Sequence, residues 1–362
     1  MILSIKTETF KDLLDKALKG VSNNKLFPIT SLVGIQFADG ELTVMTYDGN
    51  NSIYLFHYLG EEEGQKQVYV AVEANKLHDL IGKITDETIQ LIFGEDSFNV
   101  KSSNGTFKFS VAVEDGFGVV KFPDNQTPLL QEEGIKYIEL YYKDLELLLK
   151  VNRAAAAKTS EVICLTGAYI GEKIITTDSY VACITDKDLF NETMLLNYTT
   201  IDLLPIFEND EKVVAVIGKD RISFYTDNAI VVGSKMSQLN DFPGKEIMSF
   251  LELQFTNQCL VKKSEILDAL DRLNIFITPF DKNIMELSFT ENSLTIKSLN
   301  SNAVESIPIK NGANLVCKTG FSGLKNEISS VVDETFTLKF GNDIALAVVD
   351  SIATHIISLA EE

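Results

Sequence analysis

The stretch LFPITSLVGIQFADGELTVMTYD, residues 26–48, decides the fold of this chain. Residues 32–37 have the composition of a β-strand, and residues 42–47 return with alternating apolar side chains. Between them, Asp39-Gly40 forms a turn, because these two residues tolerate the positive φ angles of a tight hairpin. The stretch therefore predicts a β-hairpin.

This hairpin occurs three times along the chain. Residues 163–186 and 284–307 repeat its pattern, and an amphipathic helix precedes each copy. Those first helices are predicted at about 8–20, 143–158 and 263–274. Second helices are predicted at 73–84, 200–209 and 322–331, each after a further strand and followed by three more strands. A unit of about 120 residues used three times predicts an α+β fold, with helices on one face of antiparallel sheets. The predicted domains are 1–126, 127–250 and 251–362.

Composition limits the classes of protein that fit. The chain has 362 residues and a hydrophobic content of 45%, so each repeat can bury a core. No apolar run is long enough for a membrane span, and the N-terminus does not resemble a signal peptide. The four cysteines form no CxxC pair and are expected to be reduced core residues of a cytoplasmic protein. The formal charge of −20 argues against a surface that coats DNA, although one basic face remains compatible with it.

The sequence carries no pattern typical of catalysis. His57, His78 and His355 lie in distant segments, and none is near a pair of cysteines. Residues 320–323, Gly-Phe-Ser-Gly, are one residue short of a nucleophile elbow, and no phosphate loop is present. We therefore expect no enzyme, no catalytic residue, no metal and no cofactor.

The first helices of the three repeats carry slightly more basic than acidic side chains, although the whole chain has 32 basic and 52 acidic residues. Two interpretations fit this bias. The helices either face a polyanion or carry ordinary ion pairs between residues three or four apart. The second helix of repeat two, around Asp202, Glu208 and Asp210, has no basic residue and departs from an evenly basic face.

Three short segments give the repeats a family resemblance. Residues 27–29 (Phe-Pro-Ile), residues 177–182 (Thr-Asp-Ser-Tyr-Val-Ala) and Phe242-Pro243 stand in the same order and spacing as in the bacterial sliding clamp, the β subunit of DNA polymerase III. The chain resembles that family over its whole length. The resemblance implies three clamp domains, each with antiparallel sheets outside and two helices inside, and a homodimeric ring.

The resemblance also implies a function. Such rings encircle duplex DNA without reading its sequence, tether the replicative DNA polymerase and are opened by a separate ATP-driven clamp loader. The competing interpretation is a scaffold of repeated α+β units that binds protein partners without encircling DNA.

Site residues follow from the resemblance position by position. Residues expected to face DNA are Lys11, Lys25, Lys150, Arg153, Lys158 and Lys262. Residues expected at the dimer interface are Phe107, Phe109, Ile275 and Phe276. A pocket for a Gln-Leu-x-Leu-Phe-like partner peptide is expected from Leu165, Thr177, Ser179, Tyr180, Val181, Pro243, Met248, Ile356, Ile357 and Ser358. Phe107 and Phe109 have a competing interpretation as buried core, and so do Leu165 and Val181.

Overall fold

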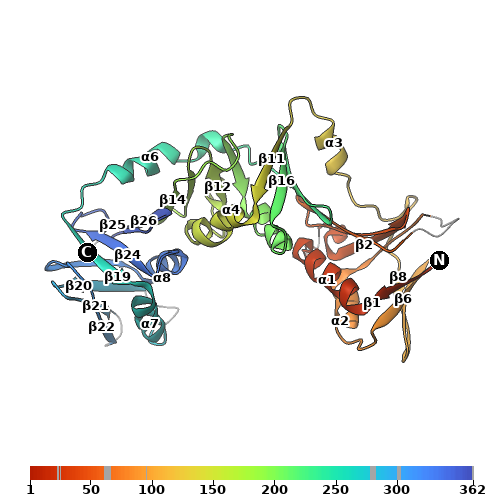
Figure 1. Ribbon diagram of the computed structural model, residues 1–362, viewed down its shortest axis with the longest axis horizontal. Coiled ribbons are helices and arrows are strands. Elements are labelled where there is room, and N and C mark those ends of the chain that lie inside the picture. The colour runs from red at the N-terminus through yellow and green to blue at the C-terminus, as the bar shows by residue number, and fades with distance from the viewer. Residues whose placement is uncertain are drawn as a thin grey trace. The chain divides into compact units, whose positions relative to one another are not determined.

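The computed structural model describes residues 1–22, 24, 26–60, 67–94, 96–277, 283–299 and 303–360 (Figure 1). The chain forms two compact units. Unit 1 contains Met1–Tyr142 and Asp202–Lys235, and unit 2 contains Lys143–Ile201 and Met236–Glu362. The α+β class is confirmed. The division into three domains stays a prediction.

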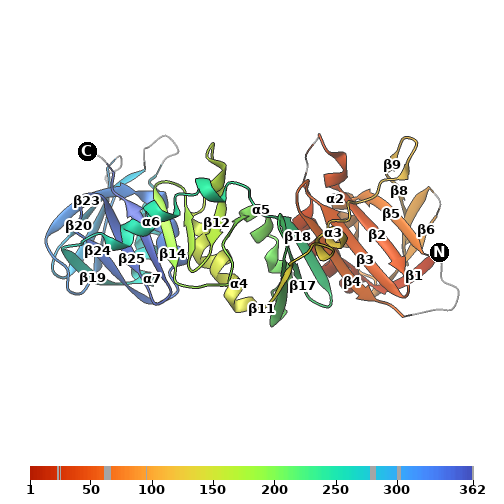
Figure 2. The same cartoon turned by 90° about the horizontal axis from the view of Figure 1, so that it is seen from above.

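Unit 1 contains two main antiparallel sheets. The smaller has the order β1-β6-β7-β8, and the larger has eight strands in the order β11-β16-β17-β18-β4-β3-β2-β5 (Figure 2). The strands of unit 1 are β1 (Ile2–Lys6), β2 (Leu32–Ala38), β3 (Glu41–Tyr47), β4 (Ser52–Tyr58), β5 (Val68–Glu73), β6 (Thr88–Phe93), β7 (Ser97–Ser102), β8 (Gly105–Ser110), β9 (Val113–Glu114), β10 (Gly118–Val119), β11 (Lys136–Tyr141), β16 (Lys212–Ile217), β17 (Arg221–Tyr225) and β18 (Ala229–Ser234). Its helices are α1 (Thr7–Ala17), α2 (Ala74–Ile81) and α3 (Gln126–Leu130).

Unit 2 has the same plan. Its eight-stranded sheet has the order β15-β12-β13-β14-β26-β25-β24-β19, and its smaller sheet has the order β22-β21-β20-β23. Its strands are β12 (Gly167–Ile170), β13 (Ile174–Thr177), β14 (Val181–Thr185), β15 (Met194–Asn197), β19 (Asn257–Lys262), β20 (Ile284–Phe289), β21 (Ser293–Ser298), β22 (Val304–Pro308), β23 (Leu315–Gly320), β24 (Thr335–Phe340), β25 (Ala345–Val349) and β26 (Ala353–Ser358). Its helices are α4 (Tyr142–Glu146, which begins at the last residue of unit 1), α5 (Tyr198–Ile201), α6 (Gly244–Ser249), α7 (Lys263–Asn274) and α8 (Phe321–Ser330).

Each eight-stranded sheet crosses a boundary between repeats. In unit 1, β18 of repeat two pairs with β4 of repeat one, and Val231 lies opposite Ile53. In unit 2, β26 of repeat three pairs with β14 of repeat two, and Val181 lies opposite Ile357. In both places the last strand of one repeat pairs with the strand that follows the hairpin of the preceding repeat: β4 follows β2–β3, and β14 follows β12–β13. We call these two strand pairs the seams.

The helices pack against the sheets through apolar faces. Helix α1 contacts α2 and strands β1, β3 and β4, whereas α7 contacts α8 (Figure 1). The core under α7 and α8 includes Leu270 and Ile328, together with Phe289 and Phe340, whose rings stack with centroids 4.0 Å apart. Within the described part of the chain, no helix is long and apolar enough to cross a membrane.

The predicted helices differ from the observed ones where local geometry intervenes. The prediction of 263–274 is confirmed by α7. The helix predicted at 143–158 is interrupted: α4 passes into a π-helical turn at Leu147–Val151 and a 3-10 turn at Asn152–Ala155. The helix predicted at 200–209 is split into α5 and a 3-10 turn at Leu204–Phe207. Pro205 lies at the start of that turn, where its missing N–H costs nothing.

Candidate functional site

The turn between β13 and β14 sits at the seam of unit 2. Its backbone is held by side chains: Asp178 Oδ1 accepts from the N–H groups of Tyr180 (2.8 Å) and Val181 (2.9 Å). The Thr177 hydroxyl donates to the Val181 carbonyl oxygen at 2.7 Å and accepts from the Ser179 N–H at 3.0 Å. Ser179 has a positive φ of 81°. The Thr177 hydroxyl is therefore used within the turn.

A narrow apolar groove of about 80 Å³ lies beside this turn. Six of the predicted pocket residues line it: Thr177, Ser179, Tyr180, Val181, Ile356 and Ser358. The sequence reasoning missed five others: Ala182, Ile247, Phe250, Ile344 and Ala345. Tyr180 is 75% exposed and stands at the rim. We call this hollow the seam groove.

The other four predicted pocket residues do not line the seam groove. Leu165 is buried in the core beneath the seam groove, which agrees with its competing interpretation as a core residue. Ile357 points to the opposite face of β26 from Ile356, because side chains alternate along a strand. Pro243 precedes α6, and its carbonyl oxygen accepts from the Ile247 N–H.

Met248 lies at a neighbouring hollow of about 440 Å³ instead. This second hollow is lined by Tyr169, Lys173, Ile175 and Lys245, among others. Tyr169 stacks on Phe242 with ring centroids 5.5 Å apart. Helix α6 forms one wall of both hollows, since it carries Lys245, Ile247 and Met248.

Helix α6 was missed because residues 240–244 read as a loop. The signal that could have found it is the run Ile247-Met248-Ser249-Phe250-Leu251, which begins three residues after Gly244. Ile247 is buried against the sheet, and Phe250 packs beside the same core.

Of the residues predicted to face DNA, Lys11, Lys150 and Arg153 lie on helical turns, and Lys262 ends β19 directly before α7. Lys158 lies in the segment after the 3-10 turn, and Lys25 falls outside the described residues. Lys11 and Arg153 are half-buried, whereas Lys150, Lys158 and Lys262 are exposed. Several of these cations are engaged locally. Lys150 Nζ lies 2.5 Å from Glu146 Oε1, and Lys262 Nζ lies 3.9 Å from Glu265 Oε1. The Arg153 guanidinium lies 4.4 Å from the centre of the Tyr198 ring.

One acidic residue of repeat two has a cationic neighbour. Asp210 lines a hollow of about 390 Å³ in unit 1 together with Asp12 and Lys16 of α1. Burial raises the pKa of Asp210, and the positive charge of Lys16 works against that rise. Asp210 therefore belongs to a local charge cluster with α1, which accounts for part of the acidic bias around residues 202–210.

The four predicted interface residues differ in exposure. Ile275 (80% exposed) and Phe276 (57%) follow the C-terminal end of α7, and Phe107 is 39% exposed on β8. Phe109 is only 5% exposed, because it lies opposite Phe98 and below the Lys76 ammonium. This burial supports the competing interpretation of Phe109 as a core residue, and its place at a dimer interface stays a prediction.

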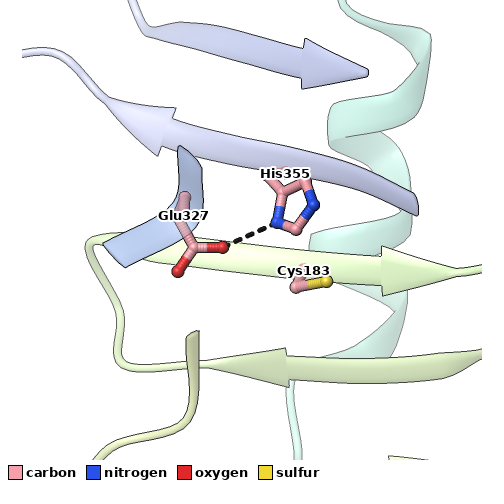
Figure 3. A group of neighbouring side chains, drawn as sticks. All are labelled: Cys183, Glu327 and His355. Carbon is pink, nitrogen blue, oxygen red and sulfur yellow. Dashed lines mark hydrogen bonds and ion pairs between the residues drawn. The ribbon is translucent and has the colours of Figure 1, made fainter. Parts of the chain in front are cut away.

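The fold brings His355 close to Cys183 and Glu327, although these residues are distant in sequence (Figure 3). His355 Nδ1 lies 2.8 Å from Glu327 Oε2. Burial opposes a charged ring, but Cys183 and Glu327 raise the pKa of His355 well above its usual range. Burial also raises the pKa of Cys183 and of Glu327. All four cysteines are free, and burial raises the pKa of Cys259 and of Cys317 to about 12.

Comparison with known proteins identifies the architecture. Residues 1–121 match the family model described as DNA polymerase III beta subunit, N-terminal domain. The DNA polymerase sliding clamp of Bacillus subtilis has a TM-score of 0.84 at 16% identity, covering 100% of this chain and 99% of that chain. The DNA polymerase III beta subunit of Thermotoga maritima has a TM-score of 0.82 at 16% identity, covering 100% of this chain and 99% of that chain. The chain has the fold of the bacterial beta clamp.

The clamp fold extends over the whole chain. The Pseudomonas aeruginosa sliding clamp bound to griselimycin has a TM-score of 0.82 at 16% identity, with complete coverage of both chains. No curated protein sequence matches the chain. The resemblance stated from the sequence is thus confirmed for the clamp fold, and for the beta-subunit family over residues 1–121.

The different burial of the two β8 phenylalanines yields a stability prediction. Phe109→Asp loses a buried ring and places a charge against Phe98, so the free energy of unfolding should fall by at least about 3 kcal/mol. Phe107→Asp should change it by less than about 1 kcal/mol. Urea unfolding at a concentration where both variants are monomeric measures the difference. Equal losses would contradict the assignment of Phe109 to the core.

Proposed function

We propose that this protein is a DNA sliding clamp. Two copies form a head-to-tail ring that encircles duplex DNA without reading its sequence and tethers the replicative polymerase for processive synthesis. A separate ATP-driven loader opens the ring, and the clamp itself, a cytoplasmic protein, performs no catalysis. The observation that carries this proposal is the clamp fold over the full chain, with both sheets continuous across the seams.

The strand order supports ring closure. Both seams join the last strand of one repeat to the strand that follows the hairpin of the preceding repeat. In the described part of the chain, β8 is the last strand of the β1-β6-β7-β8 sheet and lies at its edge. β22 is the strand that follows the β20–β21 hairpin of repeat three, and it also lies at an edge. Pairing β8 of one copy with β22 of the other repeats the seam pattern. Two such contacts close a dimer and leave neither edge free to aggregate.

Exposed apolar side chains occur near both edges. Phe107 projects from β8, and Val304 on β22 is 53% exposed. Ile275 and Phe276 follow α7, which contacts β22. Apolar side chains beside two unpaired strands favour an interface between chains.

The charges of the helices suit a sliding contact. A ring that moves along DNA must attract phosphates weakly, because each tight phosphate contact would hold it in place. Lys150 and Lys262 already have carboxylate neighbours, which moderate their attraction for DNA. The net charge of −20 disfavours DNA binding to the rest of the surface.

The seam groove and the neighbouring hollow suit a partner peptide. The seam groove offers the side chains of Ala182, Ile247, Phe250 and Ile356, which match apolar anchors such as Leu or Phe. The second hollow carries Lys245 and Glu172 around Tyr169, and its Lys173 ammonium lies 2.7 Å from Asp186 Oδ1, which suits polar groups of the same peptide. A polymerase or loader tail would thus lie along α6.

Topological retention on DNA tests the ring directly. The protein is loaded on nicked circular DNA with a matched loader, the complex is isolated by gel filtration, and the DNA is then cut once. We expect stable retention on the circle and rapid loss after linearisation, because a ring slides off free ends. A scaffold that never encircles DNA would show no retention on the circle. Retention unchanged by cutting would indicate ordinary surface binding.

Dimer formation should depend on Phe107. We expect wild-type protein at micromolar concentration to have twice the chain mass of 40.2 kDa, and Phe107→Asp to shift it toward the monomer at least tenfold in dissociation constant. The matched control is Phe117→Asp, since Phe117 is 81% exposed in the β9–β10 turn, which does not belong to the β1-β6-β7-β8 sheet. Light scattering over a concentration series measures both. A monomeric wild type, or equal effects of the two variants, would contradict the β8–β22 pairing.

Peptide binding should depend on the groove rim. A matched polymerase tail should bind with a micromolar dissociation constant, about −8 kcal/mol. Tyr180→Ala should weaken it about tenfold, because the exposed ring can cover an anchor in the groove. Met248→Ala tests the second hollow separately. Calorimetric titration of the peptide into each variant measures the affinity. An unchanged affinity for both variants would place the partner site elsewhere.

A further inference from the structure

Three side chains that can bind metal meet in the core of unit 2. Cys183 comes from β14, Glu327 from α8 and His355 from β26, and all three side chains are fully buried (Figure 3). Cys183 and His355 are direct partners across the seam. The convergence follows from the strand register and not from sequence proximity.

The approach of α8 sets the third member in place. A Cβ added at Gly323 would lie 2.9 Å from Val181 Cγ1, so the missing side chain lets the helix pack directly on β14. Glu327 follows Gly323 by four residues and therefore lies on the same helix face. Cys183 follows Val181 by two residues and shares its strand face. Glycine at 323 thus brings the carboxylate to the seam.

Two polar atoms in this cluster have no hydrogen-bond partner. They are Glu327 Oε1 and His355 Nε2. The second polar atom of each side chain does have a partner, since His355 Nδ1 lies 2.8 Å from Glu327 Oε2. An unpartnered buried polar atom costs about 1–3 kcal/mol, so two of them beside a thiol require an explanation.

We propose that Cys183, Glu327 and His355 bind one Zn²⁺-like divalent ion. One ligand atom from each residue lies within 4.8 Å of the other two. Zinc bonds to sulfur, nitrogen and oxygen of about 2.0–2.3 Å require ligand atoms roughly 3.3–3.8 Å apart in a tetrahedral site. His355 Nδ1 and Glu327 Oε2, now 2.8 Å apart, would separate slightly to share the ion, and Cys183 Sγ would approach them. A bidentate Glu327 carboxylate would then give Oε1 a partner.

Charge and ligand type select the ion. A thiolate, a carboxylate and a neutral imidazole carry a total charge of −2, which one divalent ion neutralises inside the core. The sulfur ligand favours zinc over the hard cations magnesium and calcium. Binding releases the thiol proton, and the carboxyl proton where present, to solvent, so the metal replaces protons and no redox step occurs.

The surroundings of Cys183 support a fixed sulfur position. The Asn152 side-chain amide lies 3.5 Å from Cys183 Sγ, and its oxygen accepts from the Thr185 hydroxyl at 2.9 Å. A bound ion would connect β14, α8 and β26 and so fasten the seam between repeats two and three. Because the cluster is fully buried, we expect the ion to enter during folding and to exchange slowly.

Metal analysis of the untagged full chain tests the site. Wild-type protein is unfolded, freed of metal with a chelator, refolded with Zn²⁺ and desalted. We expect about one zinc per chain by mass spectrometry, resistant to chelator while folded. Refolding with Co²⁺ should produce a thiolate-to-cobalt charge-transfer band, which only a sulfur ligand gives.

Matched variants assign the ligands. Cys183→Ser should lose the zinc and the cobalt band, whereas Cys259→Ser, at another buried cysteine of the same unit, should keep both. Glu327→Gln should keep the cobalt–sulfur band but release the metal faster to chelator. Wild-type protein that refolds without retaining zinc overturns the proposal, and so does equal zinc in the two cysteine variants. The wild-type measurement decides the matter even where a variant fails to fold.

Discussion

The pairing of strands across repeat boundaries is the constraint on which the rest of this structure depends. A repeat of this kind ends in a strand whose outer hydrogen-bonding groups must find a partner, because unpaired backbone groups at a sheet edge favour aggregation. The β18–β4 and β26–β14 seams satisfy that requirement within the chain. The same requirement, applied to the edge strands β8 and β22, underlies the proposed pairing between two copies.

The seams also explain why the compact units do not coincide with the sequence repeats. Repeat two gives β11, β16, β17 and β18 to the sheet of unit 1, and β12 to β15 to the sheet of unit 2. A seam places side chains of two repeats side by side on one sheet face, which no single repeat can do. The seam groove and the cluster of Cys183, Glu327 and His355 both arise in this way.

The groove and the buried cluster lie on opposite sides of the same strand pair. Ile356 faces the groove, and its neighbour His355 faces the cluster, as alternation along β26 requires. A change in the packing of β14 against β26 would therefore affect both. This gives a physical route by which the buried cluster can influence the stability of the seam groove.

The sequence by itself determined the repeat, the α+β class, the succession of strands and helices within a repeat, and the positions of α1, α2, α7 and α8, because hydrophobic periodicity and turn residues are local signals. The whole of α7 was predicted from its apolar spacing. The tertiary structure alone decided which side chains became accessible. Phe107 and Phe109 share one strand face, yet only Phe109 is covered, because α2 brings Lys76 over its ring. Ile356 and Ile357 read alike in sequence and face different cores. His355 met Cys183 and Glu327 only through the β14–β26 register and the close approach at Gly323, since contacts between distant segments leave no periodic trace in the chain.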